Sequence, residues 1–320
     1  MNIVVWLTRV RKGVGLLTRC DRNVWMIDTM ALGRPTVVAA YLIRGKENAL
    51  IDMGYASSAE TVLKEIENSG FSSEEMDYLL PTHVHLDHSG ACGALATVFD
   101  AASIRVHPKG ERHLVDPTKV WEGARGLFGD ELMQQYGRPQ PINDPRVRAV
   151  GDNEKLKLGN GLTLRSIWTP GHATHHLSYV VEESGTVFTG DAVGIRSSVF
   201  PVLIPTTPPT SFNLETALES LRRISQLSPK RLLTPHYGIV QNAKDWLDTN
   251  IHSLEIWAAK INEMLERGLS IDSMIRLMAE EIRGRTPNPI ELPDYLRMSI
   301  RLSVLGMVRY IEFSHRSEAR

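Results

Sequence analysis

The sequence is poor in cysteine, and this scarcity excludes the small disulfide-stapled scaffolds of secreted proteins. Cys20 and Cys92 are the two cysteines in 320 residues. They are too few for a disulfide framework and are not spaced as zinc ligands. We therefore expect two free thiols in a reducing compartment, which predicts a cytoplasmic protein.

Long apolar runs and an excess of charge are also missing. No stretch of about 18 uncharged apolar residues occurs, so no membrane-spanning helix is predicted. The amino-terminal segment MNIVVWLTRVRKG has neither the apolar run nor the cleavage site typical of a signal peptide. Lysine and arginine number 36 against 37 aspartates and glutamates, a balance that predicts no nucleic-acid or membrane surface. A small-molecule substrate is the expected partner.

The chain does contain a mixed pattern of strands and helices that changes to an all-helical pattern near its end. Short apolar runs that alternate with turn residues predict β-strands from Val24 onward, the last of them RLLTPH at 231–236. Beyond it, apolar residues recur every three or four positions and predict three helices. We therefore expect an α/β domain over 1–241 and a helical domain over 242–320. These helices are expected either to cap a cleft or to form a homodimer interface.

One helix carries start and stop signals in its sequence. In SSAETVLKEIENSG, Ser57 and Glu60 fit a capping box, and Gly70 suits the position that follows a helix end. The sequence therefore predicts a helix that begins at Ser57 and ends before Gly70.

Histidines are concentrated in three short segments. Of eleven in the chain, seven lie in PTHVHLDHSG (81–90), TPGHATHHLSY (169–179) and LTPHYG (233–238). His83 and His85 are two residues apart at the end of an extended run, so both rings can point the same way. Imidazole nitrogen and carboxylate oxygen are ligands that suit zinc, and also manganese or iron. The alternative, a polar surface loop, does not explain three such segments at comparable strand ends.

These motifs resemble the metallo-β-lactamase superfamily. His83 to His88 match its signature H-x-H-x-D-H, and TPGH, FTGD and TPH match its later motifs in the same order. The resemblance covers roughly Val24 to Gly238. Within the superfamily, the chain is similar in layout to glyoxalase II and to the lactonases. It implies a four-layer αββα sandwich, here an α/β (α+β) fold with a C-terminal helical extension. The metals would lie at one edge, between the two sheets.

The resemblance also implies a binuclear centre of two divalent ions, zinc by preference. Asp52, in the strand end LIDMG, would orient one ligand. A hydroxide that bridges the ions would attack an ester, thioester or lactone, with Asp87 and Asp191 as catalytic residues. The implied ligands are His83, His85 and His172 for one ion, Asp87, His88 and His236 for the other, and Asp191 as the bridge.

Several other polar residues near these motifs are hypotheses for supporting roles. Successive side chains of a strand point to opposite faces, so either His175 or His176 faces the metals, and His176 is our choice. Arg196 suits an anionic substrate group because its planar fork matches carboxylate or phosphate, although a structural ion pair is the alternative. Tyr237 and, less directly, Tyr55 are hypotheses for hydrogen-bond donors to the substrate, with ordinary packing as the alternative.

Two functions of other kinds stay open at this point. The first is a mononuclear iron dioxygenase that acts on a persulfide, because enzymes on this fold use ligands of the type of His83, His172 and Asp191. The second is a non-catalytic ligand-binding protein. The complete ligand set argues against the second, since a degenerate member would be expected to lose ligands.

Overall fold

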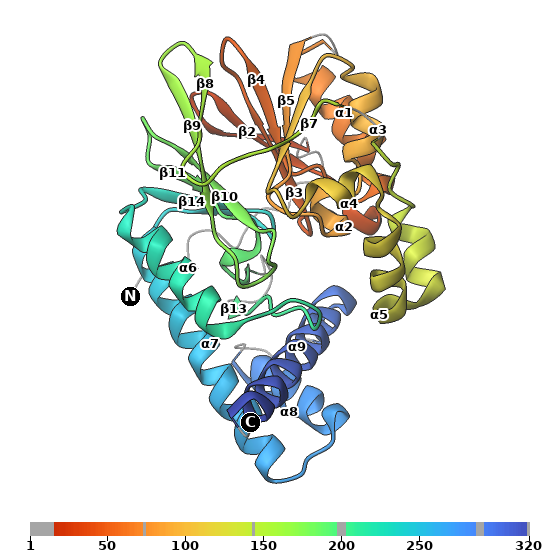
Figure 1. The fold of residues 1–320 in the computed structure, drawn as a ribbon, viewed down its shortest axis with the longest axis vertical. Helices are drawn as coiled ribbons and strands as arrows, with labels where there is room; N and C mark the ends of the chain where they lie inside the picture. Colours follow the sequence, from red (N-terminus) through yellow and green to blue (C-terminus); the bar gives the residue numbers. More distant parts are fainter. Residues whose placement is uncertain (1–15, 73–74, 143–144, 197–202, 286–290, 319–320) are drawn as a thin grey trace.

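Two stacked β-sheets with helices on both outer faces form the body of the protein (Figure 1). The computed structural model describes residues 16–72, 75–142, 145–196, 203–285 and 291–318. The four layers confirm the α/β fold class expected from the sequence. Among the described helices, none is long and apolar enough to cross a membrane.

The first sheet has seven strands that follow one another in chain order. The strands β1 to β4 are antiparallel neighbours, whereas β4 to β7 are parallel. The carboxyl ends of β4 and β5 therefore meet at one edge of the sheet, where the first histidine segment begins. The strands are β1 (Leu17–Asp21), β2 (Val24–Asp28), β3 (Ala39–Ile43), β4 (Asn48–Ile51), β5 (Met76–Leu80), β6 (Ser103–Val106) and β7 (Val147–Ala149).

The second sheet has six strands in the order β15-β14-β11-β10-β9-β8. They are β8 (Lys155–Gly159), β9 (Leu162–Trp168), β10 (Leu177–Val181), β11 (Thr186–Phe188), β14 (Arg231–Thr234) and β15 (Gly238–Val240). The expectation that 231–236 is the last strand is wrong, because the chain turns at Gly238 and adds β15 antiparallel to β14. A separate ribbon pairs β12 (Ile195–Arg196) with β13 (Leu203–Ile204).

Helices cover the two outer faces. The 3₁₀ turns η1 (Ala31–Gly33), η2 (Ala56–Ser58) and η4 (Gly190–Ala192) follow the strands β2, β4 and β11, respectively. On the side of the first sheet are α1 (Ala59–Asn68), α2 (Leu86–Ser89), α3 (Cys92–Val98), α4 (Glu111–Val115) and α5 (Thr118–Tyr136). On the side of the second sheet are α6 (Leu214–Gln226), α7 (Ala243–Glu266), α8 (Ile271–Gly284) and α9 (Asp294–Glu318).

Alternation along the strands builds the core in three layers. On β3, Tyr41 and Ile43 point between the sheets, whereas Leu42 points to the layer of α1 and α3. On β11, Phe188 points between the sheets and Val187 points to the layer of α6 to α9. This two-residue period is why the sandwich is apolar on both faces of each sheet.

The helix after β4 starts differently from the prediction. The 3₁₀ turn η2 precedes it, α1 begins at Ala59, and the preceding Ser58 makes no capping hydrogen bond with its side chain to the described residues. The capping box of Ser57 and Glu60 is therefore wrong. Gly70 does follow the helix end with a φ of 85°, as predicted.

The three C-terminal helices are present as expected. They share one apolar cluster with α6 and the outer face of the second sheet. The division into two domains at 241/242 and a homodimer through these helices both stay predictions.

Candidate metal centre

Seven histidine and aspartate side chains meet at one edge of the sandwich, and both sheets supply them. The first sheet supplies the segment after β5, which contains four of them. The second sheet supplies three single residues, each of which directly follows a strand. They are His83, His85, Asp87 and His88 after β5, His172 after β9, Asp191 in η4 after β11, and His236 after β14.

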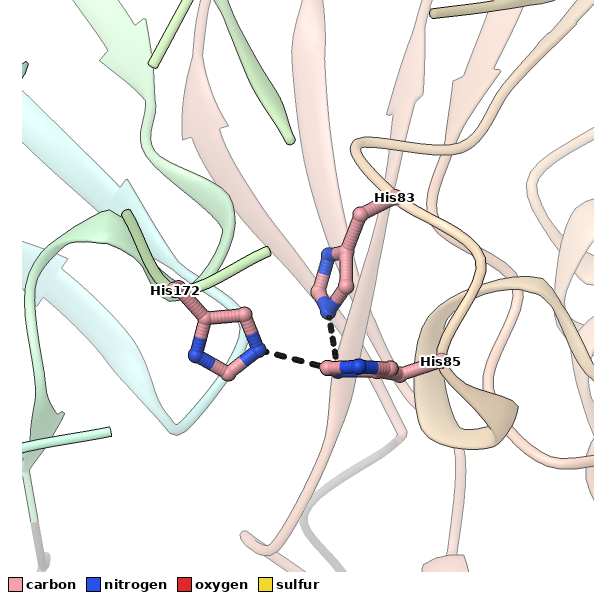
Figure 2. A group of neighbouring side chains, drawn as sticks. All are labelled: His83, His85 and His172. Carbon is pink, nitrogen blue, oxygen red and sulfur yellow. Dashed lines mark hydrogen bonds between the residues drawn. The ribbon is translucent and has the colours of Figure 1, made fainter. Parts of the chain in front are cut away.

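Three histidines form the first donor group (Figure 2). His83 Nε2 lies 3.0 Å from His85 Nδ1, and His172 Nε2 lies 2.9 Å from the same atom. Donors around a tetrahedral zinc ion are separated by roughly 3.3 Å, because each Zn–N bond is about 2.0–2.1 Å long. The three ring nitrogens therefore have the spacing of a metal site within a few tenths of an ångström.

The second donor group consists of Asp87, His88 and His236. The Nε2 atom of His236 lies 3.3 Å from Asp87 Oδ2, and that of His88 lies 3.5 Å from it. Asp191 Oδ1 is 3.4 Å from both imidazoles. Its other oxygen, Oδ2, is 3.5 Å from His172 of the first group. The Asp191 carboxylate therefore lies between the two groups and faces each with one oxygen.

Two atoms at the centre of this arrangement are buried and make no hydrogen bond to the described residues. Among the described residues, His88 Nε2 and Asp191 Oδ1 are fully buried and make no hydrogen bond. A buried polar atom without a partner is costly, and the great majority of such atoms in native proteins are satisfied. A cation between the two atoms would satisfy both. The donor set therefore fits divalent metal ions.

Four of the five histidines are held through the nitrogen that points away from the centre. A ligating histidine usually donates its other ring N–H in this way, which fixes its tautomer and orientation. The pairs are His83 Nδ1 with Thr82 Oγ1 at 3.1 Å, His88 Nδ1 with Asp52 Oδ2 at 3.0 Å, His172 Nδ1 with the Thr206 carbonyl at 3.0 Å, and His236 Nδ1 with the Val37 carbonyl at 3.2 Å.

Asp52 connects two of these histidines. Its Oδ1 accepts hydrogen bonds from the backbone N–H of Thr82 at 2.8 Å and from the Thr82 hydroxyl at 3.0 Å. Its Oδ2 faces His88. The predicted position of Asp52 beside a ligand is where the structure places it, whereas Thr82 and Thr206 were not predicted.

Burial keeps the first donor group neutral. It lowers the pKa of His83 and His85 well below the usual range, and the neighbouring imidazoles lower both further. Burial also lowers the pKa of His172, although Asp191 opposes the change. Neutral imidazoles are the form that binds a metal ion.

Charge dominates the second donor group. Burial acts to lower the pKa of His236, but Asp191 and Asp87 outweigh it and raise the pKa to about 10. The pKa of His88 is likewise raised well above its usual range against the effect of burial, chiefly by Asp87 and Asp191. Both carboxyl groups have lowered pKa values despite burial, because the imidazoles stabilise their ionised forms.

The His176 side chain contacts the site through the backbone N–H of Asp191. Its Nε2 accepts a hydrogen bond from the Asp191 N–H at 2.9 Å, and its Nδ1 lies 2.9 Å from Thr169 Oγ1. A Cβ on the preceding Gly190 would lie 2.5 Å from His176 Nε2, so the approach requires glycine. His176 therefore holds the turn that carries Asp191, while its neighbour His175 lines the cavity beside the centre.

The residues predicted to bind substrate have different positions. The Tyr237 hydroxyl donates to Asp28 Oδ2 at 3.3 Å, and Tyr237 is not among the described residues that line the cavity. This position gives no support to a contact between Tyr237 and the substrate. Arg196 pairs through its backbone with Leu203 in the ribbon, and its side chain lies outside the described part of the chain. Tyr55 does line the cavity, stacked on Tyr136 at 4.2 Å between ring centroids.

A cavity of about 610 Å³ opens onto the donor groups. Its inner end contains His85, Asp87, His172, Asp191 and His236, and its walls come from η1, α5, the 206–211 segment and α9. The sequence predicted the inner end from its histidines and aspartates. The wall on α9 agrees with the expectation that the C-terminal helices cap a cleft, whereas the walls on η1, α5 and the 206–211 segment were not predicted.

Comparison with known proteins gives consistent matches to one superfamily. A family model described as the metallo-beta-lactamase superfamily matches residues 33–236. The metallo-beta-lactamase fold-containing protein ST1585 of Sulfurisphaera tokodaii is 32% identical over 210 residues, which are 64% of this chain and 75% of that protein. An atrochrysone carboxyl ACP thioesterase of Aspergillus fumigatus is 24% identical over 208 residues, which are 65% of this chain and 52% of the thioesterase.

Solved structures show the same architecture. The crystal structure of ST1585 matches with a TM-score of 0.65 and 25% identity, and the match covers 90% of this chain and 99% of that chain. TTHA1429 of Thermus thermophilus, described as a metallo-beta-lactamase family protein, matches with a TM-score of 0.64 and 20% identity over 93% of this chain and 95% of that chain. Shares this large include part of the C-terminal helices as well as the sandwich.

Proposed function

The chain belongs to the metallo-β-lactamase superfamily, and from that premise we propose that it is a hydrolase that holds two divalent metal ions and cleaves an ester, thioester or lactone. The observation that carries the proposal is the position of Asp191, whose two oxygens face two separate groups of donors. A mononuclear site would leave the group of Asp87, His88 and His236 without a function.

The donor atoms indicate which residues would hold each ion. His83, His85 and His172 would hold one, Asp87, His88 and His236 the other, and Asp191 both. Imidazole and carboxylate ligands suit zinc, which is our proposed metal, and are also compatible with iron or manganese. The ions, when bound, would activate water near neutral pH and polarise a carbonyl oxygen.

The protein's own residues have separate tasks in this proposal. Asp87 lines the cavity as an ionised carboxylate, so it can accept a hydrogen bond from an attacking water and orient it. Asp52 and Thr82 orient His88 and His83 before the reaction, which removes the need to reorganise them during it. The apolar walls of the cavity exclude bulk water from the reacting carbonyl.

Two relatives that are named for an activity support hydrolysis, and one of them supports a carbonyl substrate. The fungal relative is named as a thioesterase, and MJ0888 of Methanocaldococcus jannaschii, 29% identical over 175 residues, 50% of this chain and 77% of that protein, is named as a probable metallo-hydrolase. Esters and lactones share the attacked group with thioesters, an acyl carbon bound to an electronegative leaving atom. We therefore extend the proposal to all three.

The test is metal quantification on the purified protein, followed by hydrolysis of a panel of thioesters, esters and lactones with and without chelator. We expect two zinc ions per chain and hydrolysis that the chelator abolishes. Asp191→Asn removes the shared charge and is expected to lower kcat/KM by about a hundredfold or more. His252→Ala, a change at a histidine on α7 that is exposed to solvent, is the matched control and should have no effect.

Other results would point to the alternatives. One iron ion per chain with oxygen consumption on a persulfide would indicate the dioxygenase. Bound metal without turnover of any compound in the panel would indicate a ligand-binding protein. Either result would overturn the proposed hydrolase.

A further inference from the structure

The cavity next to the candidate metal centre is polar at its inner end and predominantly apolar along the walls on α5 and α9, although Arg34, Lys119 and Asp294 also line it. Its inner end is formed by the ionisable donor residues already described. From there the cavity extends between α5 and α9, two helices that approach each other below the first sheet (Figure 1). A ligand that fills it must therefore combine a reactive polar group with an apolar body.

The wall on α5 is an apolar stripe whose side chains are only partly buried by the rest of the protein. In the small apolar cluster around this stripe, only Leu86, Met133 and Tyr136 are fully buried. A row of apolar side chains that faces an enclosed space and is incompletely covered is typical of a ligand site, because water in contact with it can be displaced. The residues of the stripe that line the cavity are Val120, Ala124, Leu127, Phe128 and Leu132.

The opposite wall is a second apolar face of α9. One face of this helix, with Leu296, Ile300 and Val304, is fully buried in the cluster formed with α7 and α8. Met298 and Leu302 lie on another face, are half-buried and line the cavity. The helix α9 therefore has apolar residues on a face that does not pack in the cluster with α7 and α8.

We propose, on the basis of the hydrolase function above, that the substrate carries a long apolar acyl chain that lies between α5 and α9. Its carbonyl group would lie at the inner end, beside the donor residues. Hydrolysis would break the bond between the acyl carbon and the leaving oxygen or sulfur, join that carbon to the oxygen of water, and transfer a proton to the leaving group. The apolar walls bind the acyl part, so the helices set the preferred chain length.

The first test compares straight-chain acyl esters and thioesters from butanoyl to hexadecanoyl. Each methylene buried against the walls is expected to raise kcat/KM about fourfold, so decanoyl, with six more methylenes than butanoyl, should exceed it by up to about four thousandfold. Hydrolysis with a constant or falling kcat/KM along the series would overturn the inference and leave the proposed hydrolase intact.

A narrowed cavity provides the second test. Ala124→Phe places a ring in the space between the helices and should shift the preferred chain to a shorter one, because kcat/KM falls more for decanoyl than for butanoyl. Gln134→Phe, at an exposed position of the same helix that is not among the described cavity residues, is the matched control and should keep the parent preference. An unchanged preference in folded Ala124→Phe protein would also overturn the inference.

A binding measurement separates this inference from the proposed function. A dansyl-labelled fatty acid should bind the metal-free protein, and unlabelled fatty acids should displace it more strongly as their chains lengthen. Ala124→Phe should weaken this binding at least about tenfold, whereas Gln134→Phe should not. Binding of the fatty acid without hydrolysis of any acyl compound would contradict the proposed hydrolase but support the apolar site. Failure of both the metal-free and the metal-loaded protein to bind the fatty acid would contradict the apolar site.

Discussion

Asp52 fixes the tautomer of His88. Its Oδ1 is engaged by the backbone N–H and hydroxyl of Thr82, which leaves Oδ2 to accept from His88 Nδ1 at 3.0 Å. With the proton on Nδ1, the Nε2 lone pair points to the donor group. The carboxylate at this position therefore decides whether His88 can bind a metal ion.

Asp52→Asn should lower metal affinity by about 10- to 100-fold. The Thr82 N–H would hold the oxygen of the new side-chain amide, so the amide NH₂ would face His88 and favour the proton on Nε2. Asparagine also tolerates the φ of 51° at this position, so the fold should be retained. Competition with a chromophoric chelator measures the affinity. Asp77→Asn, at a half-buried carboxylate near the start of β5 that accepts from the Asn48 backbone N–H at 2.7 Å, is the control and should leave the affinity unchanged.

Metal binding near neutral pH should release protons. Without metal, His236 has a pKa raised to about 10 and His88 a pKa raised well above its usual range, so both are protonated. A metal ion must displace these protons, and affinity should therefore rise with pH up to about the raised pKa of His236. Calorimetry in buffers of different ionisation enthalpy measures the release. A binding enthalpy that is the same in every buffer would contradict it.

The histidines and aspartates of the centre could be predicted from the sequence, but the hydrogen-bond partners that hold these side chains could be predicted only in part. Histidine and aspartate indicate ligand chemistry by their identity, and their motif spacing carries the resemblance. Val37 and Thr206 act through backbone carbonyls, which every residue has. Their contacts depend on how distant segments come together, so no sequence signal identifies them.

At the scale of elements, α9 is joined to the centre through the 205–209 segment. Ser303 donates to the Pro205 carbonyl, and Thr207 donates to the Ser303 carbonyl at 2.7 Å. Between these two anchors, the Thr206 carbonyl holds His172, and the Thr206 hydroxyl donates to the Asp191 carbonyl at 2.6 Å. The position of α9 therefore affects His172 of the first donor group and Asp191, which lies between the two groups.

Gly306→Ala should disturb the centre from a distance. A Cβ at this position of α9 would overlap the Thr207 carbonyl oxygen, so the helix and the segment must separate. We expect a loss of about 1–3 kcal/mol of stability in urea unfolding and about tenfold weaker metal binding. Gly284→Ala at the end of α8 is the control, because nothing lies within 4 Å of its added Cβ. Unchanged metal affinity in Gly306→Ala would show that α9 and the centre are independent.

Most elements followed from their apolar period, and the exceptions have physical reasons. Strands such as β3 and β10 were predicted because they are buried on both faces. The start of α1 was missed because a 3₁₀ turn precedes it, and β15 because three residues are too short to show a period. The apolar stripe of α5 is interrupted at Gly129, where φ is 77°.

For the whole molecule, the donor groups connect the two sheets. The segment after β5 supplies residues from the first sheet, and His172, Asp191 and His236 come from the second. A metal ion bound between them would bind the folded protein far more tightly than the unfolded chain, in which these residues are apart.

Removal of metal should therefore lower the melting temperature. At a thousandfold excess over Kd, a ligand of the folded state contributes about 4 kcal/mol, which corresponds to a fall of roughly 5–10 °C on chelation. Differential scanning calorimetry with and without chelator measures it. The melting temperature of Asp191→Asn should fall less on chelation than that of the parent protein. An equal fall in the two proteins would mean that the metal is bound elsewhere.

The layered fold could be predicted from the sequence, and a cleft capped by the C-terminal helices was one of two expectations for them, but the residues that form its walls could not be predicted. The motifs indicated the sandwich through their resemblance to one superfamily. The cavity depends on where α9 lies relative to α5, and more than 150 residues separate the two helices. Amphipathic spacing shows that a helix has an apolar face but does not identify what the face contacts.

The two apolar faces of α9 limit how this helix can evolve. Core residues such as Ile300 and cavity residues such as Leu302 lie on different faces of this one helix, so the two faces move together. A substitution that adapts the cavity to a new compound therefore also risks the packing that keeps the C-terminal helices in place. Adaptation to new compounds is thus more accessible through α5, whose cavity face lies outside the main core and can vary at little cost to the rest of the fold.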